Sequence, residues 1–298
     1  MASAMPDPNA AINLPLAYRD HSRHWQNNVY VYPVISRRSK GLSIGVNLNP
    51  DKACNFDCIY CQVDRSTPGP AGGVEISALV AELDALLGAA ADLSLFRAPP
   101  FDAVPADQRI VRDIALSGDG EPTTYPRFDE AVEAIAQAKK RHGLDSAKIV
   151  LITDACYLTK PHVKRGLAIM DQNNGEIWAK LDAGTEEYYR LVNRPNYPLR
   201  HVIENIIDAA RARPVVIQSL WMKVHGSPPG DGEVAAFCDR LGEIVAAGGQ
   251  IKLVQVYTIA RQTAEAYATA LDSAALERIG AIVQTTARLP VETYAGVG

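Results

Sequence analysis

The sequence predicts an α/β protein built on a parallel sheet. Six apolar segments with strand character alternate with six segments whose apolar residues recur at helical spacing. The candidate strands are residues 42–48, 110–117, 148–153, 177–182, 215–222 and 251–258. A parallel crossover needs a connection long enough to hold a helix, so this alternation is typical of a parallel sheet. Its topology is either a six-stranded partial barrel or a doubly wound sheet.

The helical segments are predicted from apolar stripes and from end signals. The first stripe covers residues 79–87, with Ser77 as a cap and Gly88 as its end. The second covers 128–136 and closes at Gly143, and the third covers 163–170 after Pro161, a good first-turn residue. Three more cover residues 202–207, 234–245 and 276–283. Residues 91–109 contain three prolines and are expected to form a long irregular loop.

Composition limits the class of protein. The chain has 298 residues, 47% of them apolar, and 30 basic against 34 acidic residues give a net charge of −4. This charge balance does not favour binding to polyanions such as nucleic acids. The first residues lack the apolar stretch of a signal peptide, and no window is apolar for long enough to cross a membrane. We therefore expect a cytoplasmic protein that does not contact a membrane.

Three of the five cysteines lie within eight residues, in the order Cys54-Asn-Phe-Asp-Cys58-Ile-Tyr-Cys61. Clustered thiols favour metal binding in a reducing compartment over disulfides. A structural zinc site needs four ligands, usually in two pairs, and a ferredoxin-type site needs a nearby fourth cysteine. The sequence has neither a second pair of ligands nor a nearby fourth cysteine. Three thiolates on a cubane cluster would instead leave one iron open to a further ligand. A non-enzymatic zinc or electron-transfer module stays open as the second hypothesis.

This motif resembles the hallmark of the radical S-adenosylmethionine (SAM) superfamily, Cys-x3-Cys-x2-Cys with an aromatic residue, here Tyr60, before the last cysteine. Residues 36–65 also resemble a group related to the wyosine-type tRNA-modifying synthases. The resemblance implies a partial (β/α)6 TIM-like barrel over residues 30–294, after a flexible segment 1–29 and before a tail at 295–298. It also implies that Cys54, Cys58 and Cys61 hold a 4Fe-4S cluster that cleaves SAM. The substrate is then a small molecule or tRNA, and the electron donor is a protein such as flavodoxin or ferredoxin.

Polar residues follow the candidate strands at their carboxyl ends, where active sites of barrel folds lie. Residues 118–121 resemble the family's Gly-Gly-Glu motif, which binds the amino group of SAM, with Asp119 replacing a glycine. The other cofactor-binding candidates sit at the ends of later strands, and the full set is Tyr60, Gly118, Asp119, Gly120, Glu121, Thr153, Asp154, Lys180, Asp182, Gln218 and Tyr257. Further polar candidates around adenine and substrate are Ser219, Gln255 and Arg261.

Several residues outside these motifs carry weaker expectations. Arg194 could bind a carboxylate or phosphate, since its guanidinium offers paired donors. Cys156 and Cys238 are expected to be buried core thiols. Basic and aromatic residues near the start of the chain are expected to form a substrate lip or a phosphate-binding patch, namely His21, His24, Trp25, Arg37, Arg38 and Lys40.

Overall fold

The computed structural model describes residues 25–70 and 72–296. Its sheet follows chain order from edge to edge, β1-β2-β3-β4-β5-β6-β7-β9, and β8 pairs with β6 beyond this path. The strands are β1 (Val31–Ser36), β2 (Gly41–Val46), β3 (Val111–Leu116), β4 (Lys148–Thr153), β5 (Gly175–Lys180), β6 (Val215–Val224), β7 (Ile251–Thr258), β8 (Ala268–Ala270) and β9 (Val291–Tyr294).

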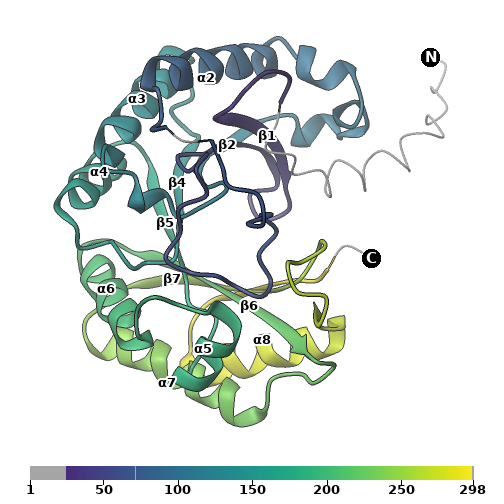
Figure 1. Ribbon diagram of the computed structural model, residues 1–298, viewed down its shortest axis with the longest axis vertical. Coiled ribbons are helices and arrows are strands. Elements are labelled where there is room, and N and C mark those ends of the chain that lie inside the picture. The colour runs from purple at the N-terminus through teal and green to yellow at the C-terminus, as the bar shows by residue number, and fades with distance from the viewer. Residues whose placement is uncertain (1–24, 71, 297–298) are drawn as a thin grey trace.

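Strand order decides between the two predicted topologies, since both have parallel strands. All neighbours from β2 to β9 pair in parallel, while β1 pairs with β2 and β8 with β6 in the antiparallel sense. A doubly wound sheet reverses its strand order at a switch point, and this sheet does not. The sheet curls into a half-barrel instead (Figure 1), which confirms the predicted partial barrel.

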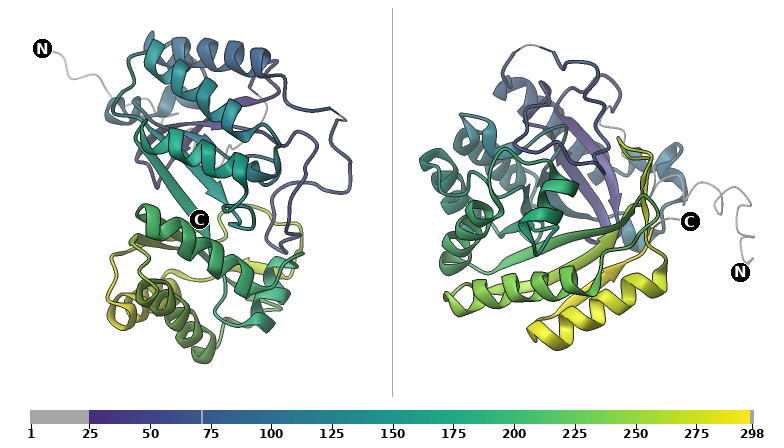
Figure 2. Two further views of the ribbon diagram at one scale, coloured as in Figure 1. Left: turned by 90° about the vertical axis from the view of Figure 1, so that its left-hand side faces the viewer. Right: turned by 60° about the horizontal axis from the view of Figure 1, so that its bottom comes forward.

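Helices cover the outer, convex side of this half-barrel (Figure 1). They are α2 (Ile76–Ala91), α3 (Phe128–Arg141), α4 (Pro161–Asp171), α5 (Glu186–Asn193), α6 (Leu199–Ala212), α7 (Asp231–Ala246) and α8 (Ser273–Ala287). All six predicted helical segments are present. Figure 2 shows α7 and α8 beneath the C-terminal strands. Their apolar stripes pack on the sheet, so the main core lies between sheet and helices and the concave side stays available for a site.

Two predicted helix ends need correction. The cap of α2 is Glu75, whose carboxylate accepts the N–H of Ser77, so Ser77 lies inside the first turn. The helix also continues past Gly88 to Ala91, because a helical glycine costs only about 1 kcal/mol and the flanking leucines are buried. Gly143, by contrast, follows α3 with φ +63°, as a C-terminal glycine should.

The strands missed by the sequence prediction are the peripheral ones, β1, β8 and β9. β1 contains Pro33, which cannot donate a ladder hydrogen bond but is tolerated in an edge strand. β8 and β9 have three and four residues, too few for a clear alternating pattern. Short patterns of this kind acquire strand structure only through their neighbours.

The predicted irregular loop 91–109 contains three short 3₁₀ turns, η1 (Ser94–Arg97), η2 (Phe101–Ala103) and η3 (Ala106–Gln108). Its apolar residues, Leu95, Phe96 and Phe101 among them, are buried. Residues 1–24 of the expected flexible segment, and residues 297–298 of the expected tail, lie outside the described residues. No helix within the described ranges is long and apolar enough to cross a membrane.

Candidate active site

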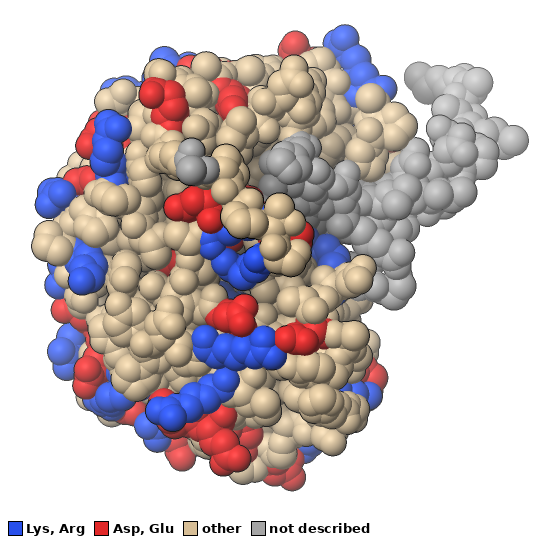
Figure 3. Space-filling model, in the orientation of Figure 1, with Lys and Arg blue, Asp and Glu red and all other residues tan. Residues whose placement is uncertain are grey.

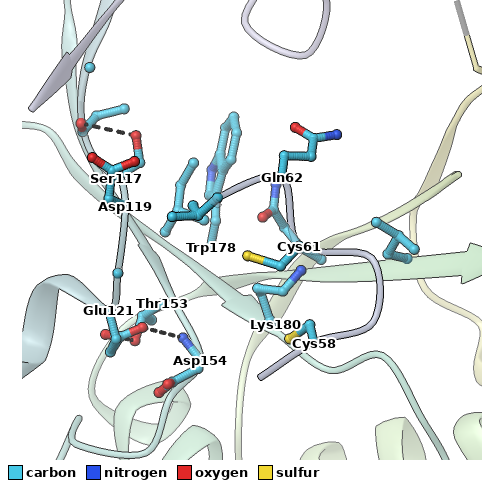
Figure 4. Close-up of a pocket in the computed structure, with 18 of the residues that line it drawn as sticks. Cys58, Cys61, Gln62, Ser117, Asp119, Glu121, Thr153, Asp154, Trp178 and Lys180 are labelled. Carbon is cyan, nitrogen blue, oxygen red and sulfur yellow. Dashed lines mark hydrogen bonds between the residues drawn. The ribbon is translucent and has the colours of Figure 1, made fainter. Parts of the chain in front are cut away.

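The concave side of the half-barrel holds a cavity of about 300 Å³. Figure 4 shows Cys61 and Lys180 on one side of it and Glu121 with Asp154 on the other. Of the residues predicted to bind cofactor or metal, those lining this cavity are Cys54, Cys58, Tyr60, Cys61, Gly118, Asp119, Gly120, Glu121, Thr153, Asp154, Lys180, Gln218 and Tyr257. Asp182 lies behind this lining, so tertiary structure gathers all but one of the predicted set around one space.

The cysteine loop follows β2 and crosses the concave side of the sheet (Figure 1). On one side it is fastened to the end of α5, since the N–H of Ile59 donates to the carbonyl of Val192 at 3.0 Å and that of Asp57 to Asn193 at 3.1 Å. On the other side the N–H of Glu121 donates to the carbonyl of Ala53 at 2.9 Å. The loop is thus held between α5 and the turn that follows β3.

The three thiols of this loop are free and partly buried. Burial raises the pKa of Cys58 to about 12, although the charge of Lys180 opposes this effect. Burial lowers the pKa of Arg65, but the neighbouring Cys61, Cys54 and Cys58 outweigh it, so its pKa lies above the ordinary value. The guanidinium of Arg65 therefore interacts electrostatically with all three sulfur atoms, and it is positioned to offset the negative charge of three thiolates.

Within the described ranges, no three His, Cys, Asp or Glu side chains are grouped so that they could hold a metal ion. The ligands of a cubane cluster need not converge on one metal ion, because each thiolate ligates its own iron and the sulfur atoms surround the cluster. Cys54, Cys58 and Cys61 line one cavity together with Arg65, and soft thiol ligands in such an arrangement are suited to an iron-sulfur cluster.

The turn after β3 requires glycine at two positions. A Cβ atom on Gly118 would lie 2.4 Å from Oδ1 of Asn47, and one on Gly120 would lie 2.0 Å from the carbonyl oxygen of Ala53. Asn47 also donates to the carboxylate of Asp119 at 2.7 Å. The turn can therefore lie directly against the cysteine loop only because it lacks side chains there.

Glu121 and Asp154 form a buried carboxyl pair on the cavity wall. Glu121 accepts hydrogen bonds from the hydroxyl of Thr153 at 2.7 Å and from the N–H of Asp154 at 2.7 Å, besides two from Thr123. Burial raises the pKa of both carboxyls, and the charge of Glu121 raises that of Asp154 further. Oδ2 of Asp154 is buried without a hydrogen-bond partner among the described residues. Two crowded carboxyls with spare acceptor capacity are suited to a cation such as an ammonium group.

A polar cluster lies behind Cys58 on the opposite wall. The hydroxyl of Tyr60 donates to Asp182, Nδ2 of Asn193 lies 3.0 Å from the same carboxylate, and Nδ2 is also 3.5 Å from Sγ of Cys58. Nζ of Lys180 lies 3.5 Å from Asp182. Lys180 is the last residue of β5 and lines the cavity, while Asp182, two residues later, contacts its neighbours from behind the lining.

Lys180 projects from this cluster toward β7. Nζ donates to the hydroxyl of Tyr257 at 3.0 Å and lies 4.9 Å from the ring centre of Tyr60. Burial alone would lower the pKa of Lys180, but Asp182, Tyr257 and Cys58 raise it above the ordinary value. The lysine is therefore a fixed positive charge next to the cysteine loop.

Other candidates fall outside the cavity lining. Gln255 is buried and accepts a hydrogen bond from Gln218 at 2.9 Å, and Ser219 is also buried. Arg194 forms ion pairs with Asp57 and Glu265, so the carboxylates that it contacts in this structure belong to the chain itself. Its role is to link the cysteine loop to the segment before β8.

The remaining expectations concern cysteines and the substrate lip. Cys156 and Cys238 are buried, as predicted. Trp25 packs edge-on against Phe101, and Lys40 is exposed, so neither lines the cavity. Arg38 does line it. His21 and His24 lie outside the described residues.

Sequence reasoning missed Arg65, Asn193 and Asp113, which lie beside the thiols or line the cavity. Arg65 comes four residues after Cys61, and a cation close to clustered thiols in the sequence could have indicated its position. Asn193 comes from α5, far along the chain, and no local pattern connects it with Cys58. Asp113 sits inside an apolar strand, where a carboxyl on the inward face could have been noticed.

A family model described as the Radical SAM superfamily matches residues 48–238, from just before the cysteine loop to the middle of α7. The chain belongs to the radical SAM superfamily. This radical SAM chain is 24% identical over 254 residues to a Brachyspira hyodysenteriae protein named GTPase Obg, which is 83% of this chain and 32% of that protein. It is 26% identical to a UPF0026 protein of Helicobacter pylori and 29% identical to UPF0026 protein slr1464 of Synechocystis, covering 59% and 55% of this chain.

The radical SAM chain spans only 49% and 52% of those two UPF0026 proteins. Among solved structures it resembles that of TYW1 with a lysine–pyruvate adduct bound. The TM-score is 0.52 at 12% identity, with 95% of this chain and 90% of that chain covered. At this identity the likeness shows a shared fold.

Proposed function

We propose that the chain holds a 4Fe-4S cluster on Cys54, Cys58 and Cys61 and uses it to cleave SAM reductively and abstract hydrogen from a substrate. A reduced cluster supplies the electron that splits SAM into methionine and a 5′-deoxyadenosyl radical. The observation that carries the proposal is the single cavity that these thiols share with the carboxyl pair Glu121 and Asp154.

The chain's own residues would orient SAM in that cavity. The carboxyl pair would take the methionyl ammonium, because both carboxyls are buried and Asp154 has an acceptor oxygen without a partner among the described residues. Lys180 and Arg65 would balance the negative charge of the thiolates and the cluster. Gln218 and Tyr257 line the cavity farther along and would face adenine or substrate. Burial of these groups keeps water away from a reactive intermediate.

Anaerobic reconstitution tests this proposal. Wild-type protein with iron, sulfide and reductant is expected to bind about four irons per chain and to release 5′-deoxyadenosine from SAM. Cys58→Ala should abolish release, while the matched variant Cys238→Ala should retain it, since Cys238 lies in the core away from the loop. A colourless protein with one zinc per chain and no SAM affinity would instead support the non-catalytic alternative.

The substrate is a separate question, and tRNA is one proposal, raised by the resemblance to wyosine-type synthases. Figure 3 shows acidic and basic side chains interleaved over one face of the molecule, without a continuous basic area there. Binding of tRNA across a range of salt concentrations tests this, because phosphate contacts give a steep salt dependence.

A further inference from the structure

The turn after β4, which carries Asp154, has a backbone conformation that needs support. Ala155, the residue after Asp154, has φ +65°, in the left-handed region that glycine adopts without cost. A residue with a Cβ atom is about tenfold less populated there. Ala155 and Cys156 are also buried, so their carbonyl groups need hydrogen-bond partners within the protein. Contacts from elsewhere in the chain must therefore hold this turn.

Asn205, a buried residue of α6, supplies these contacts. Its Nδ2 donates to the carbonyl of Ala155 at 3.0 Å and to that of Cys156 at 2.8 Å. Its Oδ1 accepts the hydroxyl of Thr159 at 3.1 Å, and this bond fixes which way the amide points. Nε2 of His201, one helical turn earlier, lies 2.9 Å from the carbonyl of Cys156. The side chain of Asn205 thus fastens two consecutive carbonyls of the turn to α6.

The fastened turn in turn fixes one oxygen of Asp154. The N–H of Cys156 donates to Oδ1 of Asp154 at 2.9 Å, and Nδ2 of Asn55 lies 3.4 Å from the same oxygen. Oδ2 is buried without a partner among the described residues, and the side chain lies beside Glu121 on the wall of the main cavity (Figure 4). A movement of the backbone at Cys156 would therefore change the direction of the spare oxygen.

We propose that Asn205 is a positioning residue for SAM, which holds the turn at Ala155 and Cys156 so that Asp154 accepts the methionyl ammonium. The inference rests on the proposed function, because it takes the carboxyl pair as the binding site of this group. Asn205 does not line the cavity, so it acts on SAM only through Asp154. Loss of its amide should therefore weaken the binding of ligands that carry the ammonium and spare those that lack it.

Calorimetric titration of the reconstituted protein with SAM tests the proposal, with the deaminated analogue of SAM, which keeps the carboxylate and adenosine, as the parallel ligand. Asn205→Ala is expected to weaken SAM binding about tenfold and to change binding of the analogue by less than about twofold. Adding Ala155→Gly to this variant should recover part of the loss, because glycine adopts a positive φ without support. Asn173→Ala is the matched control: Nδ2 of Asn173 donates to the carbonyl of Ile169 at 2.8 Å, before β5 begins, and SAM should bind as to wild type.

Thermal unfolding of each variant checks that the fold is intact. Asn205→Asp keeps the size of the side chain and loses the amide donors, so it replaces Asn205→Ala if that variant does not fold. Wild-type affinity for SAM in the Asn205 variant, an equal loss for SAM and its analogue, or no recovery on adding Ala155→Gly would overturn the proposal. If wild-type protein does not bind SAM, the proposed function fails and this inference with it, whereas SAM binding that does not depend on Asn205 refutes the inference alone.

Discussion

Gly120→Ala probes the contact between the turn after β3 and the cysteine loop. The added Cβ would lie 2.0 Å from the carbonyl oxygen of Ala53 and 2.7 Å from Cβ of Asn49, against ordinary contacts of 3.4 Å or more. Because the nearer atom belongs to the backbone, turn and loop must separate by more than 1 Å. That shift would break the hydrogen bond from Glu121 to Ala53 and displace Cys54, the next residue.

Overpacking of this kind costs about 1–3 kcal/mol of folding free energy. The larger effect is expected in the site, because a displacement of about 1 Å at reacting groups can reduce a rate about 100-fold. We therefore expect Gly120→Ala to unfold at a lower temperature, to retain less iron after reconstitution, and to release 5′-deoxyadenosine about 100-fold more slowly than wild type.

Gly88→Ala is the matched control for this experiment. A Cβ at Gly88 would meet nothing within 4 Å, and the residue lies inside α2. Alanine is the better helix former, so this variant should gain about 0.5–1 kcal/mol of stability with unchanged iron content and turnover. Wild-type iron content and turnover in Gly120→Ala would refute the view that the turn positions the cysteine loop.

Two further predictions concern buried polar groups. Burial raises the pKa of Glu176, but Lys252, Trp178 and Lys148 outweigh it, so the pKa is lowered in the folded state. Such a group stabilises the fold above its unfolded pKa of about 4.3 and loses this contribution as pH falls. Glu176→Gln should thus destabilise the protein by about 1–3 kcal/mol at pH 7 and by less toward pH 3, as measured by denaturant unfolding; a constant difference would contradict this assignment. Asn193→Ala removes donors to Tyr60, Asp182 and Cys58, so a loss of about 1–3 kcal/mol together with weaker iron retention is expected, and unchanged iron content would show that Asn193 has no part in positioning Cys58.

Local pattern accounts for much of this fold. The six central strands and six of the helices follow from apolar periodicity, because each element buries one face or stripe whatever its neighbours are. The half-barrel also follows once the family resemblance is added to the alternation. The edge strands β1 and β9 were not predicted in this way, because β1 contains Pro33 and β9 has only four residues; they pair with β2 and β7.

Local sequence patterns likewise predict one part of the candidate site and not the other. The cysteine motif from Cys54 to Cys61 and the turn from Gly118 to Glu121 could both be predicted from the sequence, because thiol spacing and glycine placement are local properties. Three other features depend on the tertiary fold: Asn193 lies behind Cys58, Arg194 forms ion pairs, and Arg38 stacks on Trp178 and Tyr257. These contacts join residues that lie far apart in the chain, and their distances depend on how the sheet curls, which no local pattern encodes.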